Sequence, residues 1–440
     1  MNRIILIGNG FDLAHGLKTG YENFINSLWK KIIDTAEYTI SQNYNSPQEY
    51  HYKNEYVDLV SLNSVDIKKL SNYEQIKNTF NVRNEPLYKS QISNLFLWII
   101  SEAMLESWYD VEQMFYESLC YCADFESNKI PSSLRGKIFK NIDKLNQNFN
   151  VIKSDLKDYL IAIQNEFRFE NFDTGKRKQI NNHIYSQFRL KDLENKGVEF
   201  LIKEEMQKFQ KFKEAFSENP QFNSFNPTIQ ERYRELESML QNKRDTDKYF
   251  TKYIKDENYA PYFFDLLPDN ILFLNFNYTN TEKYYTQGDG IKKDNIETIH
   301  IHGKLDNPKD PLIFGYGDEL CDKYKAIENL NDNRFLEHIK SINYLDTDNY
   351  KKMVQFMELA PYQIFIFGHS CGNSDRTLLN TLFEHENCVS IKPFFWEKSD
   401  RSTNYNNIIS NISRNFNNKI LMRDRVVNKE YCTPLIFENQ

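Results

Sequence analysis

The sequence predicts an α/β protein with a mostly parallel sheet flanked by helices and a large, mainly helical insertion. Short apolar runs occur at residues 4–7, 271–274, 297–301 and 363–367, and each is typical of a strand buried on both faces. A polar motif directly follows each run. Between the first two runs, apolar positions recur mainly with helical spacing. These observations favour one sheet whose strand ends carry a common site.

The expected strands are unevenly distributed along the chain. Further strand-like runs occur at residues 312–314, 388–391, 419–422 and 434–437, and a helical stretch lies at 376–386. A single N-terminal strand cannot bury both of its faces without the later strands. We therefore expect residues 1–35 and 262–440 to form one discontinuous sheet domain, with residues 36–261 as a mainly helical insertion.

One long helix is expected within the insertion. Apolar residues recur there in alternating steps of four and three: Ile138, Ile142, Leu145, Phe149, Ile152, Leu156, Tyr159, Ile163 and Phe167. This spacing predicts a continuous helix of ~30 residues with one apolar stripe. A second set indicates its antiparallel partner: Phe200, Met206, Phe209, Phe212 and Phe216. We expect the pair to cover the site or to mediate self-association, because an uncovered stripe would be a large exposed apolar patch.

Composition and charge exclude several classes of protein. A net charge of -7 over 440 residues gives no general attraction to nucleic acid. The six cysteines include no CxxC pair, which argues against a zinc cluster or a disulfide framework and fits a reducing cytoplasm. No apolar run approaches membrane-spanning length, and the N-terminal run is too short for a signal peptide. We expect a soluble cytoplasmic protein without a membrane or nucleic-acid partner.

The GNGFD motif follows the first expected strand. Gly8 and Gly10 allow a tight turn and a close ligand approach, and a helix starting at Phe11 or Asp12 would direct N–H groups toward a phosphate. Leu13 replaces the third glycine of the GxGxxG fingerprint. A carboxylate at Asp12 would cap the helix but repel a pyrophosphate. A strand-to-helix turn without any ligand would use the same glycines, so both interpretations remain open.

The next two strands end in an asparagine motif and a histidine motif. The carboxamide of Asn277 can hold a ribose hydroxyl and a water together, whereas an Asx turn or a helix cap is the structural alternative. His300 and His302 alternate on a strand and share a face, so both could ligate a metal, or the one nearer the strand end could act as a general base. Gly303 leaves the imidazole of His302 uncovered. A purely structural histidine is the alternative.

The GHSCGNSD segment lies between a strand and the next helix. Ser374 or Asp375 is expected to cap that helix, and Gly368 and Ser370 are candidates to contact a ribose or an adenine. The segment also matches a GxSxG nucleophile elbow, but the only later histidine, His385, lies inside the following helix. We therefore do not assign a nucleophile.

An acidic motif, WYDVE, belongs to a helical stretch of the insertion. Asp110 and Glu112 do not share a helix face, so a paired-carboxylate site is not expected unless the helix breaks there. We interpret these side chains as solvated acids beside a buried Trp108.

Together and in this order, the motifs resemble those of the bacteriophage abortive-infection AbiH family. The matching segments are residues 6–19, 276–279, 300–305, 367–370 and 374–376, with Trp108, Asp110 and Glu112 in the helical region. More distantly, the set resembles sirtuin-like, NAD-consuming domains with a Rossmann-like sheet. That resemblance implies that Gly8 and Gly10 cradle a dinucleotide, Asn277 orients a ribose, His302 is the catalytic base, and Gly368 with Ser370 lines the ribose and adenine pocket. No four-cysteine zinc module is present, so protein deacylation is not implied.

The resemblance implies a phage-defence protein whose Rossmann-like domain binds NAD or a related nucleotide, as substrate or ligand. If active, it would hydrolyse the nicotinamide–ribose bond without a metal. Asn277 and His302 are the candidate catalytic residues, and the candidate nucleotide contacts are Gly8, Asn9, Gly10, Asp12, Thr279, Gly368, Ser370 and Asp375.

Two alternatives remain open. The first is a nucleotide-binding sensor or scaffold without turnover, which acts through a partner that the helical insertion binds. For this function as for NAD hydrolysis, the expected partners besides the nucleotide are a phage-derived trigger or a second copy bound through the helical insertion. The second is a metal-dependent nuclease that uses His300, His302 and nearby acids.

Overall fold

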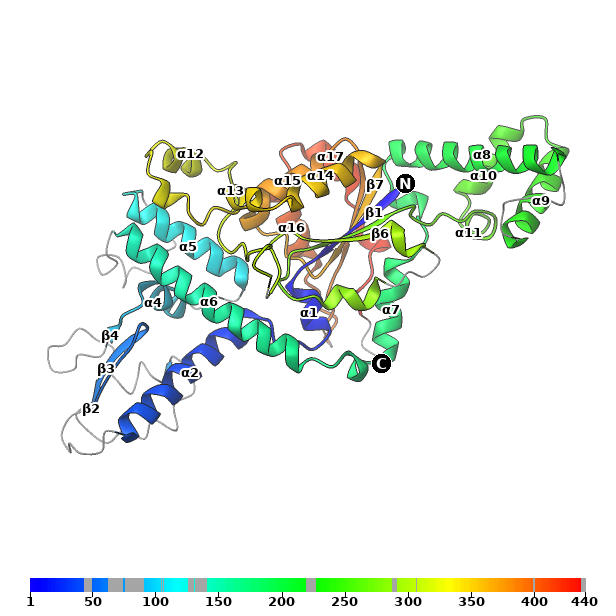
Figure 1. Cartoon of the computed structure of the whole chain (residues 1–440). Helices are drawn as coiled ribbons and strands as arrows, with labels where there is room; N and C mark the ends of the chain where they lie inside the picture. Colours follow the sequence, from blue (N-terminus) through cyan, green and yellow to red (C-terminus); the bar gives the residue numbers. More distant parts are fainter. Residues whose placement is uncertain are drawn as a thin grey trace.

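A parallel sheet lies at the centre of the molecule, and two helical bodies project from opposite sides of it (Figure 1). The computed structural model describes residues 1–42, 50–61, 74–75, 91–103, 105, 107–125, 130, 141–218, 227–286, 291–305, 307–398 and 400–436. Within these ranges, no helix is long and apolar enough to cross a membrane.

The central sheet has five strands in the order β6-β5-β1-β7-β8, and every neighbouring pair is parallel. The strands are β1 (Asn2–Ile7), β5 (Ile271–Asn275), β6 (Ile296–His300), β7 (Tyr362–Phe367) and β8 (Cys388–Phe394). The chain runs outward from β1 through β5 to β6, and then returns to the other side of β1 for β7 and β8. The strand order therefore reverses between β1 and β7, and such reversal points are where open α/β sheets bind ligands. The predicted α/β class with a parallel sheet is confirmed.

Helices cover both faces of the sheet. Ile4 and Leu6 of β1 face α14 (Asn349–Leu359), α15 (Arg376–Glu384) and α16 (Tyr405–Asn415). Ile5 and Ile7 face α1 (Asn9–Ala14), α7 (Thr174–Ile184) and the 3₁₀ helix η4 (Thr281–Tyr285). The alternation of β1 between two apolar layers explains why its sequence is an uninterrupted apolar run.

One helical body lies beside the carboxyl edge of the sheet. It contains α2 (Tyr21–Gln42), α4 (Leu95–Glu102), α5 (Trp108–Cys122), α6 (Ile142–Glu166) and an antiparallel sheet of β2 (Tyr50–Lys53), β3 (Val57–Ser61) and β4 (Gln91–Ile92). Its core also takes in Phe314 and Tyr316, which follow β6 in the chain. This shared core attaches the body to the sheet.

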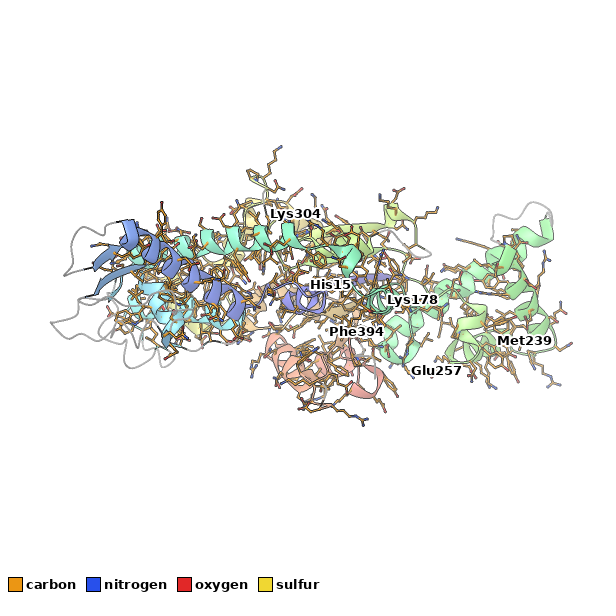
Figure 2. The ribbon with its side chains drawn as sticks, turned by 90° about the horizontal axis from the view of Figure 1, so that it is seen from below. His15, Lys178, Met239, Glu257, Lys304 and Phe394 are labelled. Carbon is orange, nitrogen blue, oxygen red and sulfur yellow. The ribbon has the colours of Figure 1, made fainter. Side chains whose placement is uncertain are left out.

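The second helical body projects from the opposite side. It contains α8 (Asn195–Glu218), α9 (Pro227–Gln241), α10 (Thr246–Lys255) and α11 (Ala260–Phe263). Figure 2 shows the separation from below, with His15 near the middle of the molecule and Met239 in the projecting body. Residues 36–261 thus contribute to both bodies and, through α7, to the sheet layers, whereas the division of the chain into two domains remains a prediction.

The remaining elements are short. They are α12 (Asp322–Glu328), α13 (Lys340–Asn343), α17 (Lys419–Arg425), η2 (Phe169–Asn171), η3 (Leu190–Asp192), η5 (Lys293–Asn295), η6 (Asn333–Phe335), η7 (Tyr344–Asp346), η8 (Asn373–Asp375) and η9 (Lys429–Tyr431). Of these, α13 and η8 contribute side chains to the site described below.

The long helix is continuous from Ile142 to Glu166, but it is shorter than expected, because Asn141 and Phe167 are extended cap residues. Its expected partner is wrong. α6 runs unbroken from Ile142 to Glu166, and the side chain of Asn141 caps it by accepting a hydrogen bond from Lys144 N. Residues 131–140, including Ile138, lie outside the described residues. α6 packs against α4 and α5, whereas α8, with Phe209 and Phe212, belongs to the other body. An apolar stripe specifies burial but does not specify the partner.

The expected strand at residues 419–422 is wrong, because these residues begin helix α17. Asn418 caps this helix with its side-chain oxygen, which accepts from Ile420 N at 2.9 Å. Basic residues at the C-terminal end also favour a helix. The short apolar run was compatible with both structures, and the cap was the signal that distinguished them.

Two further expected strands are also wrong. Residues 312–314 have no regular secondary structure and belong to neither sheet. Pro434 makes only an isolated parallel bridge with Phe395, and Phe437 lies outside the described residues. Ile313 and Leu435 pack in the layers beside the sheet, and Phe314 packs in the core of the first helical body. Periodicity alone does not distinguish such buried segments from a strand.

Candidate functional site

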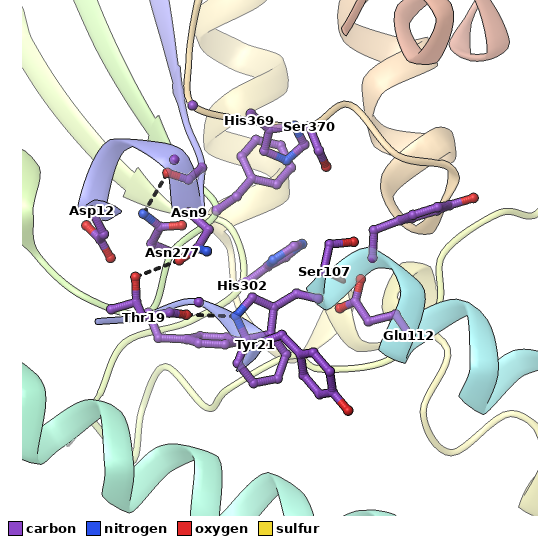
Figure 3. A pocket seen from close by; sticks show the side chains of 18 of the residues that line it. Asn9, Asp12, Thr19, Tyr21, Ser107, Glu112, Asn277, His302, His369 and Ser370 are labelled. Atoms are coloured by element: carbon purple, nitrogen blue, oxygen red, sulfur yellow. Dashed lines mark hydrogen bonds between the residues drawn. The ribbon is translucent and has the colours of Figure 1, made fainter. Parts of the chain in front are cut away.

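A cavity of ≈ 310 Å³ lies where the carboxyl ends of β1, β5, β6 and β7 meet the first helical body (Figure 3). Ten candidate residues from the sequence line it: Gly8, Asn9, Gly10, Asp12, Asn277, Thr279, His302, Gly368, Ser370 and Asp375. They are spread over more than 360 positions of sequence, and the parallel sheet brings them together. Their catalytic and nucleotide-binding roles remain predictions.

The cavity is completed by residues for which no role at the site was predicted from the sequence. They are Thr19, Tyr21, Ser107, Trp108, Tyr109, Glu112, Leu156, Leu160, Phe314, Lys340, His369 and Ser374. α5 and α6 thereby cover the carboxyl edge of the sheet. Self-association of the helical region remains a prediction.

Gly8 and Gly10, which follow β1, pack closely against the turn after β7, and this packing alone requires glycine at both positions. A Cβ atom on Gly8 would lie 2.5 Å from the His369 Cα atom, and one on Gly10 would lie 2.8 Å from the Gly368 Cα atom. Gly10 N also donates to Gly368 O at 2.9 Å. The amide of Gly10 is therefore engaged within the protein. The expected start of the helix is wrong by two residues or more, because α1 begins at Asn9.

Asp12 is buried and faces the segment after β5. Its carboxylate accepts from the hydroxyl groups of Thr279 and Thr281, the latter at 2.7 Å. Burial raises the pKa of Asp12 to about 6, although the two hydroxyls oppose this shift. The expectation that Asp12 caps the helix is wrong, since Gly8 occupies the cap position without a side-chain bond.

The amide group of Asn277 is used inside the protein. Its Nδ2 donates to Gly8 O at 3.0 Å, and its side chain also bonds to Asp12. Within the described part of the chain, the Oδ1 atom of Asn277 accepts no hydrogen bond, so this atom is the one left for a ligand. The Asx turn considered as an alternative is present but is formed by Asn275, whose Oδ1 accepts from Asn277 N at 2.8 Å.

The two histidines of the third motif belong to different networks. β6 ends at His300, so the expectation that both lie on one strand and share a face is wrong. The Nε2 atom of His300 lies 2.9 Å from Glu282 Oε1. The Nε2 atom of His302 lies 3.2 Å from Asp375 Oδ1, and His302 lines the cavity. Burial, reinforced by the Lys340 charge, lowers the pKa of His302, which favours a neutral imidazole.

The backbone conformation at residue 303 requires a glycine. The expectation that Gly303 serves to leave the His302 imidazole uncovered is therefore not needed to explain this glycine. Its φ is +82°, and a Cβ atom there would lie 2.1 Å from Pro311 O. Ile313 N donates to His302 O at 2.9 Å, which fixes the turn that carries the imidazole. The glycine therefore allows the chain to fold back closely after His302.

Asp375 is the centre of a buried charged cluster. Its Oδ1 accepts from Lys340 Nζ at 2.8 Å, and its Oδ2 lies 3.6 Å from His369 Nε2. Burial alone would raise the pKa of Asp375, but Lys340 and His302 hold that pKa well below its usual range. Asp375 occupies the N-cap position of α15 without a side-chain cap bond, so the expected capping by Ser374 or Asp375 is wrong.

The cluster fixes the protonation of both imidazoles. His369 Nδ1 accepts from Cys371 N at 3.0 Å, so we assign its proton to Nε2, facing Asp375. The same carboxylate faces Nε2 of His302, which also lies 3.3 Å from the Tyr344 hydroxyl. Because a carboxylate only accepts hydrogen bonds, we assign the proton of His302 to Nε2, and Nδ1 is then the basic nitrogen. A histidine oriented by a carboxylate in this way is a common arrangement for a general base.

Glu112 is buried rather than solvated, which corrects the interpretation of the acidic motif. Only 7% of Glu112 is exposed, and its Oε1 lies 2.7 Å from Lys340 Nζ. Burial raises the pKa of Glu112 to about 7, although Lys340 opposes this shift. Asp110 forms a capping box with Ser107 at the start of α5. That S-x-x-D signal was present in the sequence and marks the start of the helix.

Metal-ligating side chains do not gather in the part of the chain that the structure describes. No group of three or more His, Cys, Asp and Glu side chains there could hold a metal ion. The nuclease alternative would combine His300 and His302 at one metal. The Nε2 atom of His300 instead contacts Glu282, and that of His302 contacts Asp375, so the two imidazoles belong to separate networks.

The comparison with protein families identifies a match over nearly the whole chain. The family model described as "Bacteriophage abortive infection AbiH" matches residues 4–396, a range that contains all residues lining the cavity. No curated protein and no solved structure matches the chain significantly. Because the match covers well over half of the sequence, the chain belongs to the bacteriophage abortive infection AbiH family.

Proposed function

We propose that this protein binds NAD or a related nucleotide in the strand-end cavity and hydrolyses its nicotinamide–ribose bond during the response to phage. Membership of the AbiH family supports the role in abortive infection. The observation that carries the enzymatic part is the His302–Asp375 pair, a buried base with its orienting carboxylate, on the wall of a cavity at the carboxyl edge of a parallel sheet.

The chemistry needs one base and one held ribose. The C1′–N bond breaks with its electron pair going to the nicotinamide ring, which leaves as a neutral molecule. A water oxygen bonds to C1′ and gives its proton to Nδ1 of His302. The transition state resembles an oxocarbenium ion, so the site must also hold the ribose and stabilise positive charge. In this proposal, Oδ1 of Asn277 accepts from a ribose hydroxyl or from the attacking water.

Other features of the cavity favour a nucleotide. The aromatic side chains of Tyr21, Trp108 and Tyr109 line it and suit a flat heteroaromatic ring. Asn9 Oδ1 accepts from Thr19 Oγ1 at 2.6 Å, which leaves the Asn9 amino group to donate to a ligand. The strand order reverses at β1 and β7, as it does in many nucleotide-binding sheets, including the sirtuin-like type that the motifs resemble.

A direct assay is purified protein with NAD, measured for free nicotinamide. Replacing the base, His302→Ala, is expected to lower kcat by ~10²–10⁴-fold. His385→Ala, at the end of α15 and outside the cavity, is the matched control and should leave kcat unchanged. Because the pKa of His302 is lowered, its protonation should reduce activity only below about pH 6.5, the usual histidine value.

The outcomes separate the alternatives. Full activity of the His302→Ala variant would remove the basis for this mechanism. Measurable NAD binding with no release of nicotinamide would favour the sensor or scaffold. Loss of activity on adding a chelator would favour metal-dependent chemistry instead.

A further inference from the structure

Glu112 is a buried acid on the cavity wall that the proposed mechanism does not yet use. It comes from α5 in the helical body and lies across the cavity from the β1 and β5 strand-end residues Asn9 and Asn277 (Figure 3). Burying a carboxylate is costly unless it is paired, so its position calls for an explanation. Lys340 pairs with this carboxylate, and the Ser374 side chain also donates a hydrogen bond to it, yet Glu112 still lines the cavity.

The place of Glu112 is fixed by the way α5 packs on the sheet. Tyr109 lies so close to Gly372 that a Cβ atom there would be 2.4 Å from Tyr109 Cδ2. Trp108 Nε1 donates to Thr19 O at 2.8 Å, which ties the start of α5 to the segment after α1. The carboxylate is therefore held at the cavity by contacts on both sides of the helix.

The charge of this wall depends on whether Glu112 is ionised. Lys340 is the cation shared by Glu112 and Asp375, with 2.7 Å to the first carboxylate and 2.8 Å to the second. When Glu112 and Asp375 are both ionised, Lys340 balances only one of them, so these three side chains together carry a net negative charge. A negative wall next to a cavity favours a ligand that is positively charged or that becomes positively charged as it reacts.

We propose that Glu112 is a catalytic residue that accepts hydrogen bonds from the hydroxyl groups of the bound ribose and stabilises the positive charge that develops on that ring. Lys340 is then a positioning residue that holds Glu112 and Asp375 in a fixed relation. This inference rests on the proposed function and deepens it, because it identifies the ribose as the group that the α5 wall recognises. A carboxylate suits this role, since it offers several acceptor sites and a negative charge.

Only the ionised form of Glu112 would act in this way. The titratable and charged groups around it are Lys340, Asp375, His302, His369, Tyr278 and Tyr344. Because burial raises the pKa of Glu112 to about 7, protonation should begin to reduce kcat near neutral pH, above the pH at which His302 becomes protonated. The kcat of the wild type is therefore expected to fall in two steps as the pH decreases, first when Glu112 and then when His302 becomes protonated.

The test compares Glu112→Gln with Glu117→Gln in the full-length protein. Glu117 is also buried on α5 and lies 3.7 Å from Lys323, but it does not line the cavity, which makes it a matched control. We expect Glu112→Gln to lower kcat for nicotinamide release by ~10²–10³-fold and to abolish the acidic loss near pH 7. It should weaken binding of ADP-ribose but not of AMP, which lacks the second ribose. Glu112→Asp, which keeps the charge, should restore part of kcat.

The outcomes distinguish this inference from the proposed function. An active wild type with equal kcat in the Glu112→Gln and Glu117→Gln variants would overturn the role of Glu112 alone. A wild type that neither binds ADP-ribose nor releases nicotinamide would overturn both. If Glu112→Gln does not fold, binding to the wild-type protein still tests the inference. Its preference for ADP-ribose over the analogue that lacks the 2′-hydroxyl of the second ribose should increase from pH 6 to pH 8, because Glu112 becomes ionised over this range. An unchanged preference would overturn the inference.

Discussion

Two buried aspartates line the same cavity, yet their environments drive their pKa values in opposite directions. Asp12 is 1% exposed and is held by threonine hydroxyls, and its pKa is raised to about 6. Asp375 is 7% exposed and is held by Lys340, and its pKa lies well below the usual range. Burial is similar, so the difference shows that a neighbouring cation, and not depth alone, sets the charge of a buried acid.

The two aspartates also join different parts of the molecule. Asp12 connects the turn after β1 to Thr279 and Thr281 after β5, so its network stays within the sheet layers. Asp375 connects, through Lys340, to Glu112 of the helical body. The network of Asp375 and Lys340 therefore couples the position of α5 to the orientation of His302, whereas the hydroxyl network of Asp12 supports only the strand ends.

Removing the cation should produce the largest effect. Lys340→Met leaves Glu112 and Asp375 buried without their partner, and the loss of one member of a buried ion pair costs about 3–5 kcal/mol. Urea unfolding at pH 8 and pH 5.5 measures this cost. It should be larger at pH 8, because at pH 5.5 Glu112 can take up a proton and lose its charge.

The control for this variant is an exposed ion pair. Lys352 lies 3.1 Å from Asp348, and both side chains are exposed, so Lys352→Met should change the free energy of unfolding by less than about 1 kcal/mol. If Lys340→Met were no more destabilising than this control, Lys340 would not hold the two acids.

The sequence predicted the strand-end half of the cavity because parallel strands bring their carboxyl ends to one edge. Gly8, Asn277, His302 and Gly368 each follow an apolar run, and that pattern was sufficient to place them together. Their partners were not predictable in the same way. Lys340 begins a four-residue helix in a segment without periodicity, so no pattern placed its side chain.

The helical half was missed for a different reason. The spacing of Asp110 and Glu112 correctly showed that they do not share a helix face, but it did not show which face turns inward. Likewise, the stripe on α6 predicted burial without naming α4 and α5 as its neighbours. Which helices pack together depends on contacts between residues that are distant in sequence, so it could not be predicted from the local pattern. The carboxyl ends of parallel strands, by contrast, always lie at the same edge of their sheet.

The Asp12→Asn variant tests the raised pKa of Asp12. A folded pKa of about 6 against the ordinary 3.8 means that the folded state binds this proton more tightly than the unfolded state does. The stability that depends on it is fully present below about pH 3.8 and is lost as pH rises through 6. Relative to wild type, Asp12→Asn should therefore gain about 2.4 kcal/mol in its free energy of unfolding between pH 4 and pH 7.

Urea unfolding across this pH range gives the comparison directly. A constant difference between Asp12→Asn and wild type would show that Asp12 keeps an ordinary pKa. Asp375 should not contribute to a change in this window, because a lowered pKa places its loss of stability below pH 3.8.

The smallest effect should come from one of the threonine hydroxyls that bind Asp12. Thr281→Val removes the donor that lies 2.7 Å from Asp12 Oδ1, and a hydrogen bond to a charged group contributes about 1.5–3 kcal/mol. The loss should appear at pH 8, where Asp12 is ionised, and be smaller at pH 4.5, where it is protonated. Thr381→Val, whose hydroxyl donates within α15 to Thr377 O, is the control and should show no such pH dependence. An equal loss for Thr281→Val at both pH values would mean that the hydroxyl supports Asp12 regardless of its charge, and the contrast with Asp375 would then rest on Lys340 alone.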